Sequence, residues 1–495
     1  MPPPVVRWAD AEIFRWVRFV GRLDMSGFEL DLRSDGVGGV PYDQRLMLVT
    51  VWWCYRQQIR SPQRMAVQCR ESVSLRMVWQ RDRVPSASAL RRFVSGHPEG
   101  WRRLGVSLLK VCDEAGLVDL SVTATDSTPM AAPAALSKMA TAPEITVLID
   151  EVQQQLAGLR ARIARSAADD PDGFIDGCAR MHRAEQLLLV RLQRLRTAET
   201  AARARLDEIT VRGRGTLVSV RRWQARVEQH RAGLAAMTAR QQQAYDTYQA
   251  KVAAGRKPPG PAPHQPADHP HIQTKTRALH RAQARLDAAR ATPADQIRAG
   301  PAAHVSTTDP GSRILKGKPN TAPWILGGLL TLTVAVGQII LAGLLSPHGN
   351  DHPGLLPNLA ETAANCRAAG LTQPFGHHLA DNGFASTTAF TTAPPGGGAL
   401  LVCVTNEHDQ TRGRQPAAVG EARQHMAARL ATPEGHTLYA RRSPMIEPVF
   451  AHLLRTDRHL HTRGTSQHTE TLALTTAYNA RKYINRHKTP TQTGY

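Results

Sequence analysis

The sequence predicts a mixed α/β protein whose α/β portion is split by a long helical insertion. Residues 5–118 have helical patterning, and the run Val122–Thr128 alternates like a strand. Residues 144–298 are rich in Ala, Arg and Gln with helical periodicity, and an α/β pattern resumes at Val305. The expected divisions are a helical domain at 1–118, the start of an α/β domain at 119–143, an insertion at 144–300, the rest of the α/β domain at 301–488 and a tail at 489–495.

Helix-start residues mark the elements of the first domain. The apolar segment Arg45–Ile59 has to be buried, Pro62 begins the next helix after Ser61, and Ser86 caps a later one. A further amphipathic helix is expected from Glu99 to Ala115. Short helices joined by tight turns suit a helix-turn-helix-like DNA reader, and a helical core with solvated arginines is the alternative. The arginines in question are Arg60, Arg64, Arg70, Arg91 and Arg92.

The insertion is predicted to be a set of helices. An apolar stripe runs along the first of them, through Leu148, Val152, Leu156, Leu159 and Ile163. Further helices are expected at about 173–211, 216–253 and 273–290, with an extended Pro-rich loop at 255–270. Hairpins or a coiled coil would account for the stripe, so a structural role is favoured. Dimerisation and gripping DNA are the functional alternatives.

Residues 323–345 are uncharged and long enough to cross a bilayer. However, glycines interrupt the stretch, and β-branched residues alternate between Leu330 and Leu341. We therefore expect two buried strands with a hairpin or bulge at Gly337-Gln338, and no membrane span. A later strand is expected near 399–405, and helices are expected near 353–370, 415–430, 447–456 and 468–486.

Charge and cysteine usage limit the class of protein. Lys and Arg number 62 against 41 Asp and Glu, and this gives a formal net charge of +21. Such an excess suits a polyanion, because each neutralised phosphate releases counterions. The six cysteines show no C-x-x-C spacing, which disfavours a zinc knuckle. The start Met1-Pro2-Pro3-Pro4 has no apolar signal core, so a reducing cytoplasmic, nucleoid-associated location is expected.

Three carboxylates occupy distinctive settings. Asp126 ends the strand-like run, Asp381 lies in Leu379–Phe384, and Glu447 opens a helix-like segment with Pro448 at its first position. If they converge, they can hold two divalent ions, Mg²⁺ or Mn²⁺, which drive in-line attack at a phosphodiester. The alternatives are a solvated strand end, a turn residue and a partner of the helix dipole. Asp309 and Asp351 are the next candidates, although a turn and a helix cap explain them better.

Together these segments resemble the bacterial insertion-sequence transposases of the DDE class. Asp126-Ser127-Thr128-x-Met130 is similar to the first-acid motif, Ala380-Asp381-x-Gly383-Phe384 to the second, and Ile446–Phe450 to the third. The other similar segments, in chain order, are Tyr42–Phe93, Ser306–Arg313, Gly337–Leu341, Asn350–Pro357, Thr462–Gly464 and Tyr478-Asn479.

The resemblance implies an InsH-type helical N-terminal domain and an RNase H-like catalytic domain. Asp126 would come from the first, central strand and bridge both metal ions, and Asp381 and Glu447 would each hold one. The implied function is binding of terminal inverted repeats, DNA strand cleavage and strand transfer by a homodimer or larger synaptic complex. Basic residues also cluster around Glu447 and would guide a DNA backbone without reading bases, with a solvated helix face as the alternative. They are Arg441, Arg442, Arg455, Arg458 and Arg463.

Two segments depart from the family pattern. Related transposases often carry Lys seven residues after the catalytic Glu, and here that residue is Leu454, followed by Arg455. The segment after Asn320 also lacks the usual aromatic-Asn-x-Gln run. An impaired copy that only binds DNA is therefore the alternative to an active transposase.

Overall fold

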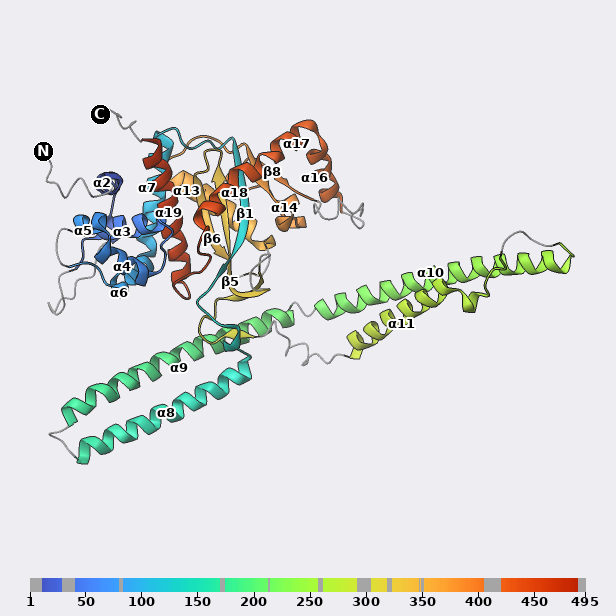
Figure 1. The fold of residues 1–495 in the computed structure, drawn as a ribbon, viewed down its shortest axis with the longest axis horizontal. Helices are drawn as coiled ribbons and strands as arrows, with labels where there is room; N and C mark the ends of the chain where they lie inside the picture. The colour runs from blue at the N-terminus through green and yellow to red at the C-terminus, as the bar shows by residue number, and fades with distance from the viewer. Residues whose placement is uncertain are drawn as a thin grey trace. The chain divides into compact units, whose positions relative to one another are not determined.

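The computed structural model describes most of the chain and shows mixed α/β architecture (Figure 1). The described residues are 11–28, 41–79, 83–169, 174–211, 214–256, 261–291, 304–317, 323–346, 348, 351–404 and 420–487. They form two compact units, one made of Met1–Lys138 with Thr308–Tyr495 and the other of Met139–Thr307. The second unit contains the predicted insertion.

The first unit is built on one mixed sheet. Its strand order is β4-β5-β1-β7-β8, and β6 pairs with the same edge of β5 as β4 does, further along the strand. Strand β5 is antiparallel to β1, β4 and β6, whereas β1, β7 and β8 are mutually parallel neighbours. The strands are β1 (Val122–Ala131), β4 (Arg313–Lys316), β5 (Trp324–Ala335), β6 (Ile340–Ser346), β7 (His377–Ala380) and β8 (Ala399–Val402).

The apolar stretch at 323–345 is a buried β-hairpin, as predicted. Strands β5 and β6 account for it, and Gln338 lies in the turn with a positive φ of 61°. A strand that is buried on both faces of a sheet does not need to alternate apolar and polar residues. Its sequence is therefore continuously apolar and resembles a membrane span. No helix among the described residues is long and apolar enough to cross a membrane.

The N-terminal helices belong to the same unit as the sheet. They are α2 (Ala11–Val20), α3 (Gln44–Arg56), α4 (Pro62–Glu71), α5 (Val73–Trp79), α6 (Ala87–Gly96) and α7 (Pro98–Glu114), with the short 3₁₀ turn η1 (Ser26–Phe28). Pro62 begins α4, and Ser86 caps α6 by accepting a hydrogen bond from the amide of Ala89, as predicted. One hydrophobic core joins Trp16, Trp52 and Trp101 to sheet residues such as Leu332. Residue 118, the expected end of a separate N-terminal domain, therefore lies inside a single compact unit and does not divide two domains.

Helices cover both faces of the sheet. The face carrying Val122 and Ala124 belongs to the core formed with α18 (Arg442–Leu453) and α19 (Ser466–Arg486), and α13 (Leu355–Ala368) packs on the other face. The smaller elements are η5 (His352–Gly354), η6 (Asn382–Phe384), α14 (Thr387–Thr391), α16 (Glu421–Ala431) and α17 (Pro433–Ala440).

Two predicted element ends are wrong. Strand β1 continues five residues beyond Asp126, because it pairs with the long strand β5 as far as Ala131. Helix α18 begins at Arg442, so Glu447 and Pro448 lie within the helix and do not open it. Sequence patterning located both segments, but tertiary pairing and packing determined their lengths.

The second unit contains two long helical hairpins. Helices α8 (Ala142–Asp169) and α9 (Phe174–Val211) pack along each other, as do α10 (Arg214–Ala253) and α11 (Pro270–Ala291). A short antiparallel pair, β2 (Met139–Ala140) with β3 (Val305–Ser306), brings the two ends of the insertion together. The turns η2 (Leu136–Lys138) and η3 (Pro266–Asp268) complete the described elements. Part of the predicted Pro-rich loop, 257–260, lies outside the described residues.

Candidate active site

Asp126 projects from the middle of the central strand. Strand residues alternate between faces, so Asp126 shares the α18 side of β1 with Ala124, and Ser127 takes the opposite side. The Asp126 carboxylate accepts a hydrogen bond from the amide of Ser127 at 2.7 Å. Its other oxygen is 3.2 Å from Nη1 of Arg442. The strand therefore holds this acid beside a cation that α18 supplies.

Asp381 is brought next to Asp126 by strand pairing. Thr125 pairs with Ala380 in the parallel β1–β7 ladder, so Asp126 and Asp381 are the next residues along two neighbouring strands. Asp381 then caps η6 by accepting a hydrogen bond from the amide of Gly383 at 3.1 Å. These two predicted acids, far apart in sequence, are neighbours in the fold.

The environment of Asp381 disfavours its charge. Burial and the negative charges of Asp126 and Asp351 raise the pKa of Asp381 to about 6, although Arg442 and the amide of Gly383 oppose the shift. A shift in this direction is typical of carboxylates that share a confined site, where one proton or cation relieves their mutual repulsion.

Asp351 is a third acid at this place, and the sequence assigned it to a helix cap. It precedes η5, but its side chain makes no capping hydrogen bond there. Its Oδ1 instead accepts a hydrogen bond from Oγ of Ser127. A Cβ atom added to Gly383 would lie 2.6 Å from Oδ2 of Asp351 and 3.1 Å from Oδ1 of Asp381. Glycine at 383 therefore permits the two carboxylates to approach the same backbone segment.

Arg442 is the cation of the site. Its guanidinium is half-buried, contacts Asp126 and lies over the Tyr439 ring at 5.9 Å. The pKa of Arg442 is raised because Tyr439, Asp126 and Asp381 together outweigh the opposing effect of burial. The predicted DNA contact of Arg442 therefore competes with an ion pair inside the site.

Glu447, the predicted third acid, does not join the other two in this arrangement. Its side chain is exposed on α18 and makes no hydrogen bond or ion pair with the described residues. Within the described ranges, no three His, Cys, Asp or Glu side chains gather closely enough to hold a metal ion. The observed site is thus an Asp126–Asp381 pair with Asp351 behind it.

Leu454 lies in the core. It directly follows α18 as the C-cap residue and is 2% exposed, whereas its neighbour Arg455 is exposed. A lysine at position 454 of this chain would have to be buried, so the family cation cannot simply be restored there.

Among the other arginines that were predicted to contact DNA, one is half-buried and the rest are exposed to solvent. Arg458 is half-buried and donates a hydrogen bond to Oγ1 of Thr128 at 3.2 Å. The exposed members are Arg64, Arg70, Arg91, Arg92, Arg441, Arg455 and Arg463.

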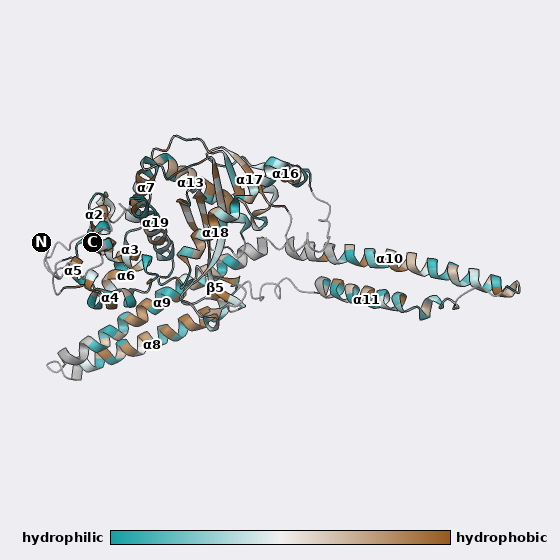
Figure 2. Cartoon of the chain, turned by 45° about the horizontal axis from the view of Figure 1, so that its top comes forward, coloured by the Kyte–Doolittle hydropathy of each residue, from teal (hydrophilic) through white to brown (hydrophobic). Residues whose placement is uncertain are grey.

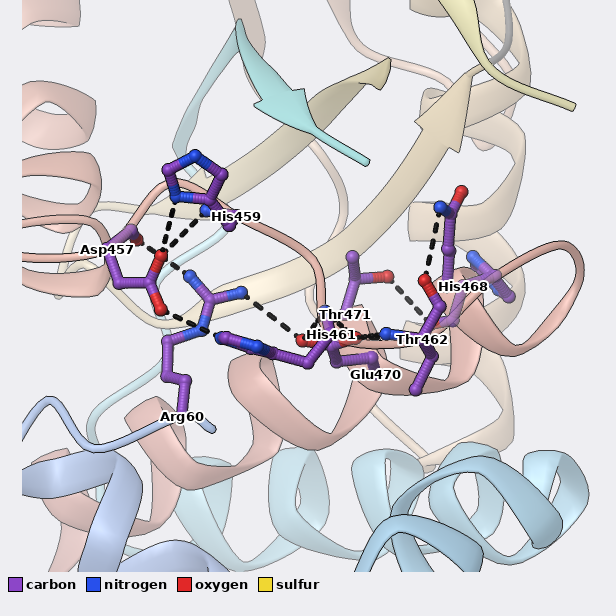
Figure 3. A network of polar contacts seen from close by, with 9 residues as sticks. Arg60, Asp457, His459, His461, Thr462, His468, Glu470 and Thr471 are labelled. Carbon is purple, nitrogen blue, oxygen red and sulfur yellow. Dashed lines mark hydrogen bonds and ion pairs between the residues drawn. The ribbon is translucent and has the colours of Figure 1, made fainter. Parts of the chain in front are cut away.

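The burial of Arg60 contradicts its prediction as a DNA contact, because only 3% of the residue is exposed to solvent. Figure 3 shows it between Asp457 and Glu470. Its Nη1 donates to the carbonyl of Asp457 at 2.8 Å, and its Nη2 lies 3.6 Å from Oε1 of Glu470. Glu470 also accepts hydrogen bonds from the amides of His461 and Thr462. Arg60 therefore connects the segment before α4 to Asp457, which lies between α18 and α19, and to Glu470 of α19.

Two further polar residues are structural: Asp309, for which a turn was the favoured explanation, and His378. Asp309 is fully buried and accepts hydrogen bonds from the amide of Gly464 and from Nε2 of Gln467. His378 is buried on β7, with Nδ1 2.6 Å from Oγ1 of Thr123 and Nε2 3.0 Å from the carbonyl of Gly397. Neither side chain is available to a ligand.

Comparisons with known proteins give this site no precedent. No protein-family model matches the chain, and neither the curated proteins nor the solved structures include a significant match.

Proposed function

We propose that this protein is a DDE transposase of an insertion sequence, which cleaves DNA strands at the ends of the element and joins them to a target. The observation that carries the proposal is the juxtaposition of Asp126 and Asp381 on the parallel strands β1 and β7. The motif resemblance selects the same two residues as the first and second acids. Strand pairing and the motif resemblance therefore both support Asp126 and Asp381 as the first two acids.

The sheet supports this assignment. Asp126 lies on the central strand, Asp381 directly follows the neighbouring strand, and Glu447 belongs to the helix that packs on β1. This is the distribution of acids that an RNase H-like catalytic domain implies. Carboxylates from separate elements can converge on one phosphodiester, whereas acids along one helix would be spread along its axis.

The paired acids fit a divalent cation. The pKa of Asp381 is raised first by burial and then by the charges of Asp126 and Asp351, and bound Mg²⁺ or Mn²⁺ would offset both effects. Asp126 and Asp381 would hold the metal, and Glu447 is the proposed third ligand, since no described hydrogen bond holds its side chain elsewhere. Bound ions of this kind activate the attacking oxygen and stabilise the leaving oxygen of a phosphodiester.

The charge of the chain supports DNA as the substrate. The net charge of +21 provides long-range attraction to the phosphates of DNA. Exposed arginines also flank Glu447 in the sequence, with Arg441 before it and Arg455 and Arg463 after it. Contacts of this kind position a DNA backbone without reading its bases. A homodimer or larger complex is part of the proposal, because two element ends must be processed together.

A strand-cleavage assay tests the proposal. The full chain is incubated with Mg²⁺ and a DNA fragment that contains both borders of the element around its gene. Asp126→Ala, Asp381→Ala and Glu447→Ala should each abolish cleavage and leave DNA binding largely intact. Cleavage at the wild-type rate by any one of these variants would remove that residue from the metal site.

A DNA-binding protein without cleavage activity is the second candidate. Leu454 in place of the family cation favours it, as does the Arg442–Asp126 ion pair within the site. If the wild-type chain binds the element ends but cuts no strand with Mg²⁺ or Mn²⁺, this candidate replaces the first.

A further inference from the structure

The two hairpins of the insertion share one design. In each, an apolar seam joins the two helices (Figure 2), and the outward residues are mostly polar, with Val147, Leu187, Val190 and Val252 as exposed apolar exceptions. The α8–α9 seam includes Ile145, Val152 and Leu195, and the α10–α11 seam includes Val227 and Leu286. Packing alone therefore gives no reason for the hairpins to differ in charge.

Their charges differ sharply nevertheless. Residues 142–211 contain 10 Lys and Arg against 11 Asp and Glu, whereas residues 214–291 contain 14 against 4. In the α8–α9 hairpin, Arg160 pairs with Glu185 and Arg203 pairs with Glu199. Among the described side chains of the α10–α11 hairpin, no arginine or lysine forms an ion pair. The excess positive charge of α10–α11 is therefore not compensated within the hairpin.

An arginine row forms one face of α11. Arg277, Arg281 and Arg285 are exposed and recur every four residues, so they follow one side of the helix for about 12 Å. Leu279 and Leu286 lie on the opposite side, in the seam. Trp223 of α10 fixes one end of the row, since the guanidinium groups of Arg285 and Arg226 lie 5.1 and 5.8 Å from its ring centroid.

We propose that the arginine row Arg277–Arg281–Arg285 makes the α10–α11 hairpin a second, sequence-independent binding surface for duplex DNA. This proposal rests on the proposed function in one respect, which is the choice of DNA as the polyanion that the arginines bind. Guanidinium groups bind phosphate oxygens in a bidentate manner, and a linear row of them suits a regularly charged backbone. A membrane surface is disfavoured, because the apolar side of α11 is buried against α10 and cannot enter a bilayer.

The test measures binding of the full chain to random-sequence duplex DNA at several salt concentrations. The triple variant Arg277→Gln/Arg281→Gln/Arg285→Gln should weaken binding on the order of tenfold or more, and should reduce the salt slope by roughly 2 to 3. The matched control removes three exposed, unpaired arginines from the other hairpin, Arg162→Gln/Arg183→Gln/Arg191→Gln. The control should bind like the wild type, and thermal melts should show that both variants remain folded.

The proposal is overturned if both triple variants lose affinity equally, since that result is a general charge effect. It is also overturned if the α11 variant binds DNA normally, or if its deficit is larger for duplex RNA or for anionic lipid vesicles. Failure here is separable from failure of the transposase proposal. Normal DNA binding by the α11 variant beside Mg²⁺-dependent cleavage by the wild type removes only the hairpin assignment, whereas a wild type that neither binds nor cuts DNA removes both.

Discussion

At the scale of single residues, the site depends on carboxylates that repel one another. Asp126 is balanced by Arg442, whereas Asp381 has a pKa raised to about 6 by burial and by Asp126 and Asp351. The fold tolerates this repulsion because strand pairing and the Gly383 backbone fix both acids in place. Functional sites commonly retain such unfavourable groups, which a ligand then stabilises.

Replacing Asp381 by Asn should stabilise the metal-free protein in a pH-dependent way. The folded-state pKa of about 6 lies above the ordinary value of 3.8, so the contribution of this carboxyl to stability falls as pH rises between them. Asp381→Asn should therefore raise the unfolding free energy by about 3 kcal/mol at pH 7.5 and by roughly half as much at pH 5. Urea unfolding in EDTA measures this difference, and a gain that grows towards acid pH would contradict it.

Arg60 and Arg64 provide a matched comparison between a buried and an exposed arginine. Arg60→Met leaves Glu470 as a buried carboxylate without its cation and should cost about 3 kcal/mol. Arg64→Met removes an exposed charge and should change stability by less than about 0.5 kcal/mol. Chemical denaturation of the two variants tests this. Equal effects would show that the network in Figure 3 does not stabilise the fold.

At the scale of elements, the β1–β5 pairing positions Asp126. A Cβ atom at Gly327 would lie 1.8 Å from the carbonyl oxygen of Met130, so the two strands approach closely only because residue 327 is glycine. Gly327→Ala should therefore destabilise the protein by about 3 kcal/mol and reduce strand cleavage through displacement of β1. Gly311→Ala is the control, because a Cβ atom there meets nothing within 4 Å. Similar melting temperatures for the two variants would refute the argument.

The sequence predicted the elements well where local patterns determine them. Pro62, Ser86 and the apolar stripe of α8 marked helices that the structure contains, and glycines in an apolar run identified the β5–β6 hairpin. Element ends that depend on partners were wrong, as with β1 and α18. The adjacency of Asp126 and Asp381 followed only from a family resemblance, because strand order is a non-local property. The burial of Arg60 and the position of Asp351 were missed because no local pattern distinguishes them from solvated residues.

At the scale of the whole molecule, two compact units have separate hydrophobic cores. In the described part of the chain, no residue is shared between the cores of Met139–Thr307 and those of the sheet unit. The proposed catalytic acids lie in the sheet unit, whereas the arginine row lies in the insertion. The proposed strand chemistry and the proposed hairpin surface for DNA thus belong to different units, and each should be removable without destroying the other.

Excising the insertion tests this division. Ala140 and Val305 are paired neighbours in β2 and β3, so Asn-Gly can replace residues 141–304 as a two-residue hairpin turn. The shortened chain should unfold cooperatively with a midpoint close to that of the sheet unit in the full chain, because the cores of that unit are intact. It should retain metal-dependent cleavage at low salt and lose it at lower salt concentrations than the full chain does, since the exposed arginines of α11 are gone. A shortened chain that is unfolded would show that the insertion stabilises the sheet unit. Cleavage with unchanged salt sensitivity would show instead that the insertion has no part in holding DNA.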